Sequence, residues 1–214
     1  MCSHYQQLKL DEIGWKRFAG AAPAGPLKSD LWPGYTGAFV RRHPQAGVGE
    51  HAMPEREALP GVFGLVPHWA KDLTIARHTF NARSETAAQK PSFRDAWRKG
   101  QRCIIPAAAI FEPDWRSGKA VATRIALADG EPMGLAGLWA WSPLNGGTLS
   151  YTMLTINADA HEFMNQFHRP GEEKRMVVIL PDEAYSAWLD ASPAEQVGFL
   201  RPYPAEQLTA AVGG

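Results

Sequence analysis

Short apolar runs alternate with turn residues over the second half of the chain, which is the pattern of an antiparallel β-sheet. Asn145-Gly146 separates two of these runs, and this dipeptide favours a tight hairpin turn. Residues 1–60 show no lasting periodicity and predict long loops around one or two short strands, followed by a short strand within 61–69. The strands expected from the later runs are 103–106, 121–128, 133–141, 149–156 and 176–180.

Short helices are expected between these strands. Ser92 stands where an N-cap residue would, and Phe93 and Trp97 then share one apolar face of a helix that ends near Gly100. Hairpins with intervening short helices indicate an α+β fold with a mainly antiparallel sheet. No internal repeat or linker divides the chain, so we expect a single domain over residues 1–214. The other expected helices lie at 159–167, at 181–189 and after the Ser192–Glu195 capping box.

The composition narrows the class of protein without indicating a function. The chain has 214 residues, 45% of them hydrophobic, and its 22 basic residues balance 22 acidic ones. A net charge of zero argues against a protein that holds nucleic acid by bulk charge, but a local basic groove is compatible with it. Two cysteines, no apolar run of membrane-spanning length and a polar N-terminus favour a reducing compartment, and we expect a cytoplasmic protein with no membrane partner.

Cys2 is the most unusual residue by position. Methionine aminopeptidases remove Met1 when a small residue such as cysteine follows it, and this would leave a free amine and a thiol on adjacent carbons of Cys2. Such an aminothiol condenses with an aldehyde to an imine, which the thiol closes to a thiazolidine ring. An α-amine has a pKa of about 7.7 to 8.0, so part of it is neutral and nucleophilic near pH 7. The alternative is that position 2 belongs to a frayed terminus.

The remaining polar residues admit ordinary structural roles. Cys103 precedes two isoleucines and is expected to be a small buried side chain. Glu112 follows an apolar run, as either a surface charge or an inward-facing acid, and His168 could end a helix at the surface. The seven histidines lack H-E-x-x-H spacing, and no C-x-x-C or phosphate-binding glycine loop is present, so we expect neither a metal site nor a cofactor.

Several short motifs, taken in order, resemble the SRAP family, the SOS-response-associated peptidase-like proteins that cross-link to abasic sites in single-stranded DNA. The resemblance runs from residue 1 to about 180. It implies an α+β fold with a curved, mainly antiparallel sheet or barrel core flanked by short helices, and a positively charged groove for single-stranded DNA. After the initial Met-Cys, the motifs are FGLVPHW (63–69), NARSET (81–86), PSFRDAW (91–97), RCIIPAAAIFE (102–112), AGLW (136–139) and RMVVIL (175–180).

The resemblance also implies roles for individual residues. Cys2 would be the covalent nucleophile, and Asn81 would hold the N-terminal residue and the sugar. Glu112 would move protons around the imine, and His168 would assist ring opening and reversal. A Glu and a His with different pKa values can together supply both directions of proton transfer. The residues expected to bind DNA are Arg83, Trp69, His4, Arg94 and Arg102.

The chain departs from the family pattern at several points, three of which adjoin the implied site residues in sequence. Cys2-Ser3-His4 replaces the usual Cys-Gly-Arg, so His4 stands where the family has an arginine. Pro113, rather than tryptophan, follows Glu112, and a polar insertion, RPGEEK, separates His168 from Arg175.

Three functions therefore stay open. The first is covalent capture of abasic DNA by a monomer, with lyase-like chemistry. The second is a thiol peptidase with Cys2 as nucleophile and His168 as base, which in its simplest form removes Met1 from its own chain. The third is a DNA-binding module with a decayed active site.

Overall fold

The computed structural model describes residues 2–9, 12–47 and 53–212, and in this part of the chain twelve strands form one sheet. The strands are β1 (His4–Gln7), β2 (Asp30–Leu31), β3 (Thr36–Arg42), β4 (Arg56–Phe63), β5 (Asn81–Arg83), β6 (Arg102–Asp114), β7 (Val121–Leu127), β8 (Met133–Ser142), β9 (Thr148–Asn157), β10 (Arg175–Val177), β11 (Ile179–Leu180) and β12 (Leu208–Val212). The helices are α1 (Glu12–Lys16), α2 (Ser84–Ala87), α3 (Arg94–Arg98) and α4 (Tyr185–Asp190), with short 3-10 turns between strands. None of the helices in the described ranges is long and apolar enough to cross a membrane.

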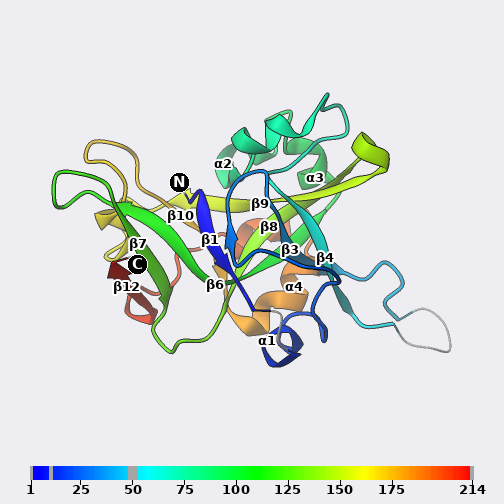
Figure 1. Cartoon of the computed structure of the whole chain (residues 1–214), viewed down its shortest axis with the longest axis horizontal. Coiled ribbons are helices and arrows are strands. Elements are labelled where there is room, and N and C mark those ends of the chain that lie inside the picture. Colours follow the sequence, from blue (N-terminus) through cyan, green and yellow to red (C-terminus); the bar gives the residue numbers. More distant parts are fainter. Residues whose placement is uncertain (1, 10–11, 48–52, 213–214) are drawn as a thin grey trace.

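Five strands close into a barrel, around which the other strands and the helices lie (Figure 1). β6 pairs with β8, β8 with β9, β9 with β4, β4 with β3, and β3 returns to β6. The β4–β9 pair and the outer β5–β9 pair are parallel, and the other strand pairs are antiparallel. The α+β fold with a curved, mainly antiparallel sheet expected from the sequence is therefore confirmed.

Aromatic rings fill the barrel where neighbouring strands carry large side chains inward. Tyr5, Phe39, Phe63 and Tyr151 are all fully buried and contact one another edge-on, tilted or stacked. The hydroxyls of Tyr5 and Tyr151 lie 2.5 Å apart, so each of these two buried polar groups has a hydrogen-bond partner. This packing fixes β1 against the barrel wall and thereby fixes the position of the N-terminal segment.

The first 60 residues are more regular than their sequence indicates. They contain β1, β2, β3 and most of β4, where the sequence predicts loops around one or two short strands. The reason lies in burial and in proline and glycine content. Residues 37–40 of β3 are buried on both faces, which removes the alternation of polar and apolar positions that identifies a strand. β4 carries Pro60 and Gly61 within it, residues that usually mark turns.

Of the four expected helices, two contain short α-helices, α3 and α4, and the other two are only 3-10 turns, at Met164–Gln166 and Glu195–Phe199. The 159–167 helix is only a 3-10 turn over Met164–Gln166, and the helix expected from Ser92 starts after Phe93 without a side-chain cap. The Ser192–Glu195 capping box is confirmed, because Ser192 N–H donates to Glu195 Oε2 at 2.7 Å and Glu195 N–H donates to Ser192 Oγ at 3.2 Å.

Candidate active site

Four segments that are distant in sequence meet around Cys2. Asn81 opens β5, Glu112 lies near the end of β6, and His168 lies in the loop between β9 and β10. Asn81 Nδ2 donates to the Cys2 carbonyl oxygen at 2.7 Å, and His168 Nδ1 lies 3.4 Å from Glu112 Oε2. The negative charge of Glu112 also acts on the Cys2 thiol, which places these two side chains near each other. The structure therefore brings the four predicted residues into one cluster.

The Cys2 thiol is buried and protonated. Its side chain is 1% exposed, and its Sγ lies 3.2 Å from the carbonyl oxygen of His4, to which it donates. Burial and, to a smaller extent, the nearby Glu112 raise the pKa of the thiol far above its ordinary value. A thiolate is therefore not preformed here, in contrast to cysteines whose thiolates are the active nucleophile.

Glu112 is a buried acid with a pKa near neutrality. Only 2% of the residue is exposed, and burial raises its pKa from 4.5 to about 7. At neutral pH the carboxyl group therefore populates both protonation states. A group with this property can donate and accept a proton in successive steps.

His168 is held in an unusual backbone conformation. Its φ is +65°, in the left-handed region that residues other than glycine seldom adopt. Its N–H donates to Pro113 O at 2.9 Å, and its Nε2 donates to Arg175 O at 2.8 Å. This second bond places the ring proton on Nε2 and turns Nδ1 toward Glu112, while burial lowers the pKa of the imidazole. Glu112 in its protonated form can then donate to a neutral His168 ring.

The RPGEEK insertion loops out and leaves the cluster intact. Lys174 Nζ donates to the carbonyl oxygens of His168 at 3.0 Å and Arg169 at 2.9 Å, so the insertion is closed at its base. Arg175, which follows, is 3% exposed and forms ion pairs with Glu85 at 2.9 Å and Glu173 at 2.7 Å. The sequence marks these two cations only by position, because Lys174 ends the RPGEEK insertion and Arg175 begins the RMVVIL run.

Asn81 adds a buried acceptor to the cluster. Its side-chain Nδ2 donates to the Cys2 carbonyl oxygen, whereas Oδ1 is buried with no hydrogen-bond partner in the part of the chain that the structure describes. An unsatisfied buried oxygen costs free energy, and such atoms are found where a ligand donor can complete the bond.

A family model, SOS response associated peptidase (SRAP), matches residues 1–212. The chain belongs to the SRAP family. Its structure superposes on that of a Bordetella bronchiseptica protein with a TM-score of 0.88 and 48% identity over all of both chains. A Bacteroides thetaiotaomicron protein shares the fold at a TM-score of 0.76 and 20% identity, over 99% of this chain and 91% of that one.

Curated relatives of this SRAP chain carry a common name. The abasic site processing protein YoqW of Bacillus subtilis is 37% identical over 153 residues, which is 69% of this chain and 65% of that protein. The abasic site processing protein HMCES of Gallus gallus is 31% identical over 174 residues, which is 69% of this chain and 50% of that protein. These matches thus span about two thirds and one half of the relatives' own lengths.

The residues expected to bind DNA in this SRAP chain differ in their accessibility. Trp69 is 47% exposed and Arg94 is exposed. Arg83 is exposed but its Nη1 lies 2.6 Å from Glu173 Oε2. The expectation that Arg102 binds DNA is wrong. Arg102 lies in the barrel strand β6 and is only 5% exposed, and its Nη1 donates to Gln196 Oε1 at 3.3 Å. A side chain in this position packs the core and does not reach a surface ligand.

The acidic residues that offset the positive charge of the expected DNA groove are not all where we expect them. Zero net charge predicts that acidic residues lie away from the groove, around 55–57 and 172–173. Glu57 does lie elsewhere and pairs with Arg41 at 2.8 Å, but Glu173 pairs directly with Arg83 and Arg175. The Glu173 carboxylate is therefore paired with the Arg83 guanidinium, the group that is expected to bind a phosphate.

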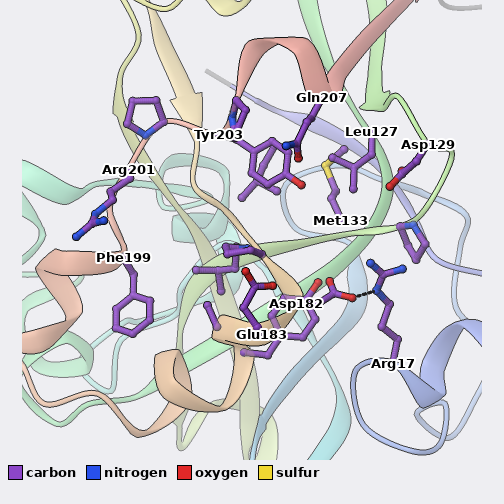
Figure 2. Close-up of a pocket in the computed structure, with 18 of the residues that line it drawn as sticks. Arg17, Leu127, Asp129, Met133, Asp182, Glu183, Phe199, Arg201, Tyr203 and Gln207 are labelled. Atoms are coloured by element: carbon purple, nitrogen blue, oxygen red, sulfur yellow. Dashed lines mark ion pairs between the residues drawn. The ribbon is translucent and has the colours of Figure 1, made fainter.

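A separate cavity of about 950 Å³ is lined by residues of other segments (Figure 2). Arg17 and Asp182 form an ion pair on its wall, and Tyr203 and Phe199 contribute aromatic surface. None of the four predicted catalytic residues lines it. The size of this cavity therefore does not identify it as the site of SRAP chemistry.

Proposed function

We propose that this chain, once Met1 has been removed, captures abasic sites in single-stranded DNA through a thiazolidine linkage to Cys2. Met1 itself lies outside the described residues. The observation that carries the proposal is the meeting of Cys2 with Asn81, Glu112 and His168, which come from four separate segments. The name of the curated relatives, abasic site processing protein, supports the same substrate.

The chemistry needs an aldehyde, an amine and a thiol and is balanced without an oxidant or a reductant. The ring-opened abasic sugar presents an aldehyde at C1′. The Cys2 amine adds to this carbon, and loss of water gives an imine. The thiol then adds to the imine carbon, its proton passes to the nitrogen, and the thiazolidine ring closes. The first step of this sequence is therefore nucleophilic attack by an amine, which forms a covalent intermediate.

Glu112 and His168 suit the proton transfers of this sequence. Water leaves the carbinolamine only when its oxygen is protonated, and the thiol adds only when its proton can depart. A carboxyl group with a pKa of about 7 performs both transfers near neutral pH. His168 Nδ1, 3.4 Å from Glu112, exchanges protons with it.

The raised pKa of the Cys2 thiol favours the amine over the thiol as the first nucleophile. A cysteine peptidase depends on a thiolate that a base generates, usually a histidine in hydrogen-bond contact with the sulfur. Here burial disfavours the thiolate, and His168 is engaged with Glu112 and with the carbonyl of Arg175. These contacts support aldehyde capture over peptide hydrolysis.

The deciding experiment is incubation of processed protein with single-stranded DNA that holds one abasic site, followed by a denaturing gel. We expect an adduct that resists denaturation in the wild type and in Cys103→Ala. Cys103 is a matched control because it is also a free, buried cysteine. Cleavage of peptides without an adduct would favour the peptidase, and a shift without covalency would favour a binding module.

Two further samples separate the amine from the thiol. Protein that retains Met1 has an amide nitrogen at Cys2, whose lone pair is delocalised, so we expect no stable adduct. Cys2→Ser keeps the amine, so we expect an imine that hydrolyses readily unless borohydride reduces it. A durable adduct from Met1-retaining protein, established by intact mass, would refute the mechanism.

We further propose that Arg83, Arg94 and Trp69 guide the DNA strand to this cluster. All three side chains are accessible, and positive charge with aromatic surface suits single strands. Binding through phosphates must weaken as salt is added. An affinity that is independent of salt would argue against a phosphate groove.

A further inference from the structure

Three aromatic rings from neighbouring strands form a stacked column on the outside of the barrel. Trp32 directly follows β2, His4 opens β1, and Phe111 lies in β6. The His4 ring centroid is 4.2 Å from that of Trp32 and 4.0 Å from that of Phe111, with 10° between the planes in both pairs. We call Trp32, His4 and Phe111 the three-ring column.

The strand register explains why these rings stack. His4 is paired with Phe111, and Trp32 lies one position beyond Leu31, which is paired with Tyr5. Directly opposed residues on one face of antiparallel strands have side chains in contact. Asp30 Oδ1 accepts from His4 Nε2 at 2.9 Å and fixes the orientation of the middle ring.

The column lies close in sequence to the Cys2 cluster and ends at solvent. Phe111 directly precedes Glu112, and His4 is two residues from Cys2, a backbone length of at most about 7 Å. Both faces of the His4 ring are covered by its neighbours, so its ring supports the stack rather than presenting a face to DNA. Trp32, at the other end, is 45% exposed.

Tyr35 and Lys28 lie beside Trp32, the exposed end of the column. Tyr35 N–H donates to Trp32 O at 2.9 Å, which closes a turn, and the Tyr35 side chain is 40% exposed. The Lys28 ammonium lies 4.0 Å from the centre of the Tyr35 ring. Positive charge interleaved with exposed aromatic rings is the surface that single-stranded nucleic acid binds through phosphates and bases.

We propose that the exposed face of Trp32 binds a nucleobase of the captured strand as the fourth ring of the column. The inference rests on the proposed function, because it takes the strand around the abasic site as the occupant. The abasic nucleotide itself has no base, so stacking of a neighbouring base would hold the strand while its sugar reacts. His4, which replaces the family's arginine, thus acts by positioning Trp32.

The test uses undamaged single-stranded oligonucleotides, so that no covalent step contributes. Loss of one base–aromatic stack costs about 1 to 3 kcal/mol, which is a roughly 5- to 150-fold weaker affinity. We expect Trp32→Ala to show such a loss in fluorescence anisotropy, and Trp32→Phe to retain most of the affinity. Trp141→Ala is the matched control, because Trp141 is 53% exposed and lies near the β8–β9 hairpin.

A scan with base-free spacers identifies the partner of Trp32. One stable tetrahydrofuran spacer is placed at each position of the oligonucleotide in turn. At the stacking position the spacer should weaken binding to the wild type and have little effect on Trp32→Ala, since the contact is already lost there. Spacer effects that are equal in both proteins at every position would overturn the inference, as would equal losses in Trp32→Ala and Trp141→Ala.

The remaining outcomes separate this inference from the proposed function. If no adduct forms with abasic DNA, but one spacer weakens binding to the wild type and not to Trp32→Ala, the capture chemistry is rejected and base stacking on Trp32 is retained. An adduct without that difference between the two proteins would reject base stacking on Trp32 alone. Sedimentation without DNA tests a second copy as the occupant, and a wild-type dimer that Trp32→Ala dissociates would overturn the inference.

Discussion

Replacing Glu112 by Gln should stabilise the folded protein at alkaline pH while impairing its chemistry. Glu112 is fully enclosed, and burial raises its pKa from 4.5 to about 7. Between these pH values the folded protein holds a proton that the unfolded chain has released. The free energy of unfolding therefore falls as pH rises through this window, and the loss is complete above pH 7.

The size of the effect follows from the two pKa values. At about 1.4 kcal/mol per pH unit, the interval from 4.5 to about 7 corresponds to roughly 3 kcal/mol. Gln has nearly the same shape and carries no charge, so Glu112→Gln removes this cost. The variant should gain roughly 2 to 3 kcal/mol relative to wild type between pH 5 and pH 8, or roughly 5 to 10 °C in Tm.

The assay is urea or thermal unfolding of wild type and variant at pH 5 and pH 8. His168 has a lowered pKa and contributes the opposite slope at acidic pH in both proteins. Glu162→Gln is the control, because Glu162 is exposed and its replacement should have the same small effect at both pH values. A difference between wild type and Glu112→Gln that does not change with pH would refute the reasoning.

The same variant should lose rate in the abasic-site assay. General acid–base groups contribute roughly 10²- to 10⁴-fold, and Gln cannot exchange protons in this way. The combination of higher stability and slower adduct formation separates a chemical role of Glu112 from a structural one. Unchanged adduct formation in Glu112→Gln would remove Glu112 from the mechanism.

Three further changes test other parts of the structure. Glu173→Gln should free Arg83 from its 2.6 Å ion pair and strengthen binding to single-stranded DNA at low salt, as anisotropy would show; unchanged affinity would mean that Arg83 does not meet DNA. Arg175→Ala should destabilise by about 1 to 3 kcal/mol in urea unfolding, because it removes a buried side chain that donates to the Thr155 carbonyl oxygen at 2.8 Å. Gly64→Ala should lower Tm strongly or prevent folding, because φ is +117° and the new Cβ would lie 2.2 Å from Ala76 O; a wild-type Tm would contradict this packing.

The sequence by itself determined the strands of the second half and the chemistry of the individual residues. The runs at 121–128, 133–141 and 149–156 match β7, β8 and β9 within a residue or two, because their apolar content and the Asn145-Gly146 turn are local signals. The Ser192–Glu195 capping box was equally readable, since it involves only four consecutive residues. The aminothiol potential of Cys2 likewise depends only on its position in the chain.

The tertiary structure decided everything that depends on contacts between distant segments. The pairing of β6 with β8 that helps to close the barrel cannot be deduced from strand patterns. Residues 37–40 of β3 are buried on both faces in the closed barrel, so β3 shows no alternation of polar and apolar residues. Glu112 at the end of a strand could be a surface charge or an inward acid, and only its burial in the folded chain raised its pKa to about 7. Burial of Arg102 and capture of Arg83 by Glu173 have the same origin. Solvation and partner distance set the behaviour of a charged group, and neither exists until the chain has folded.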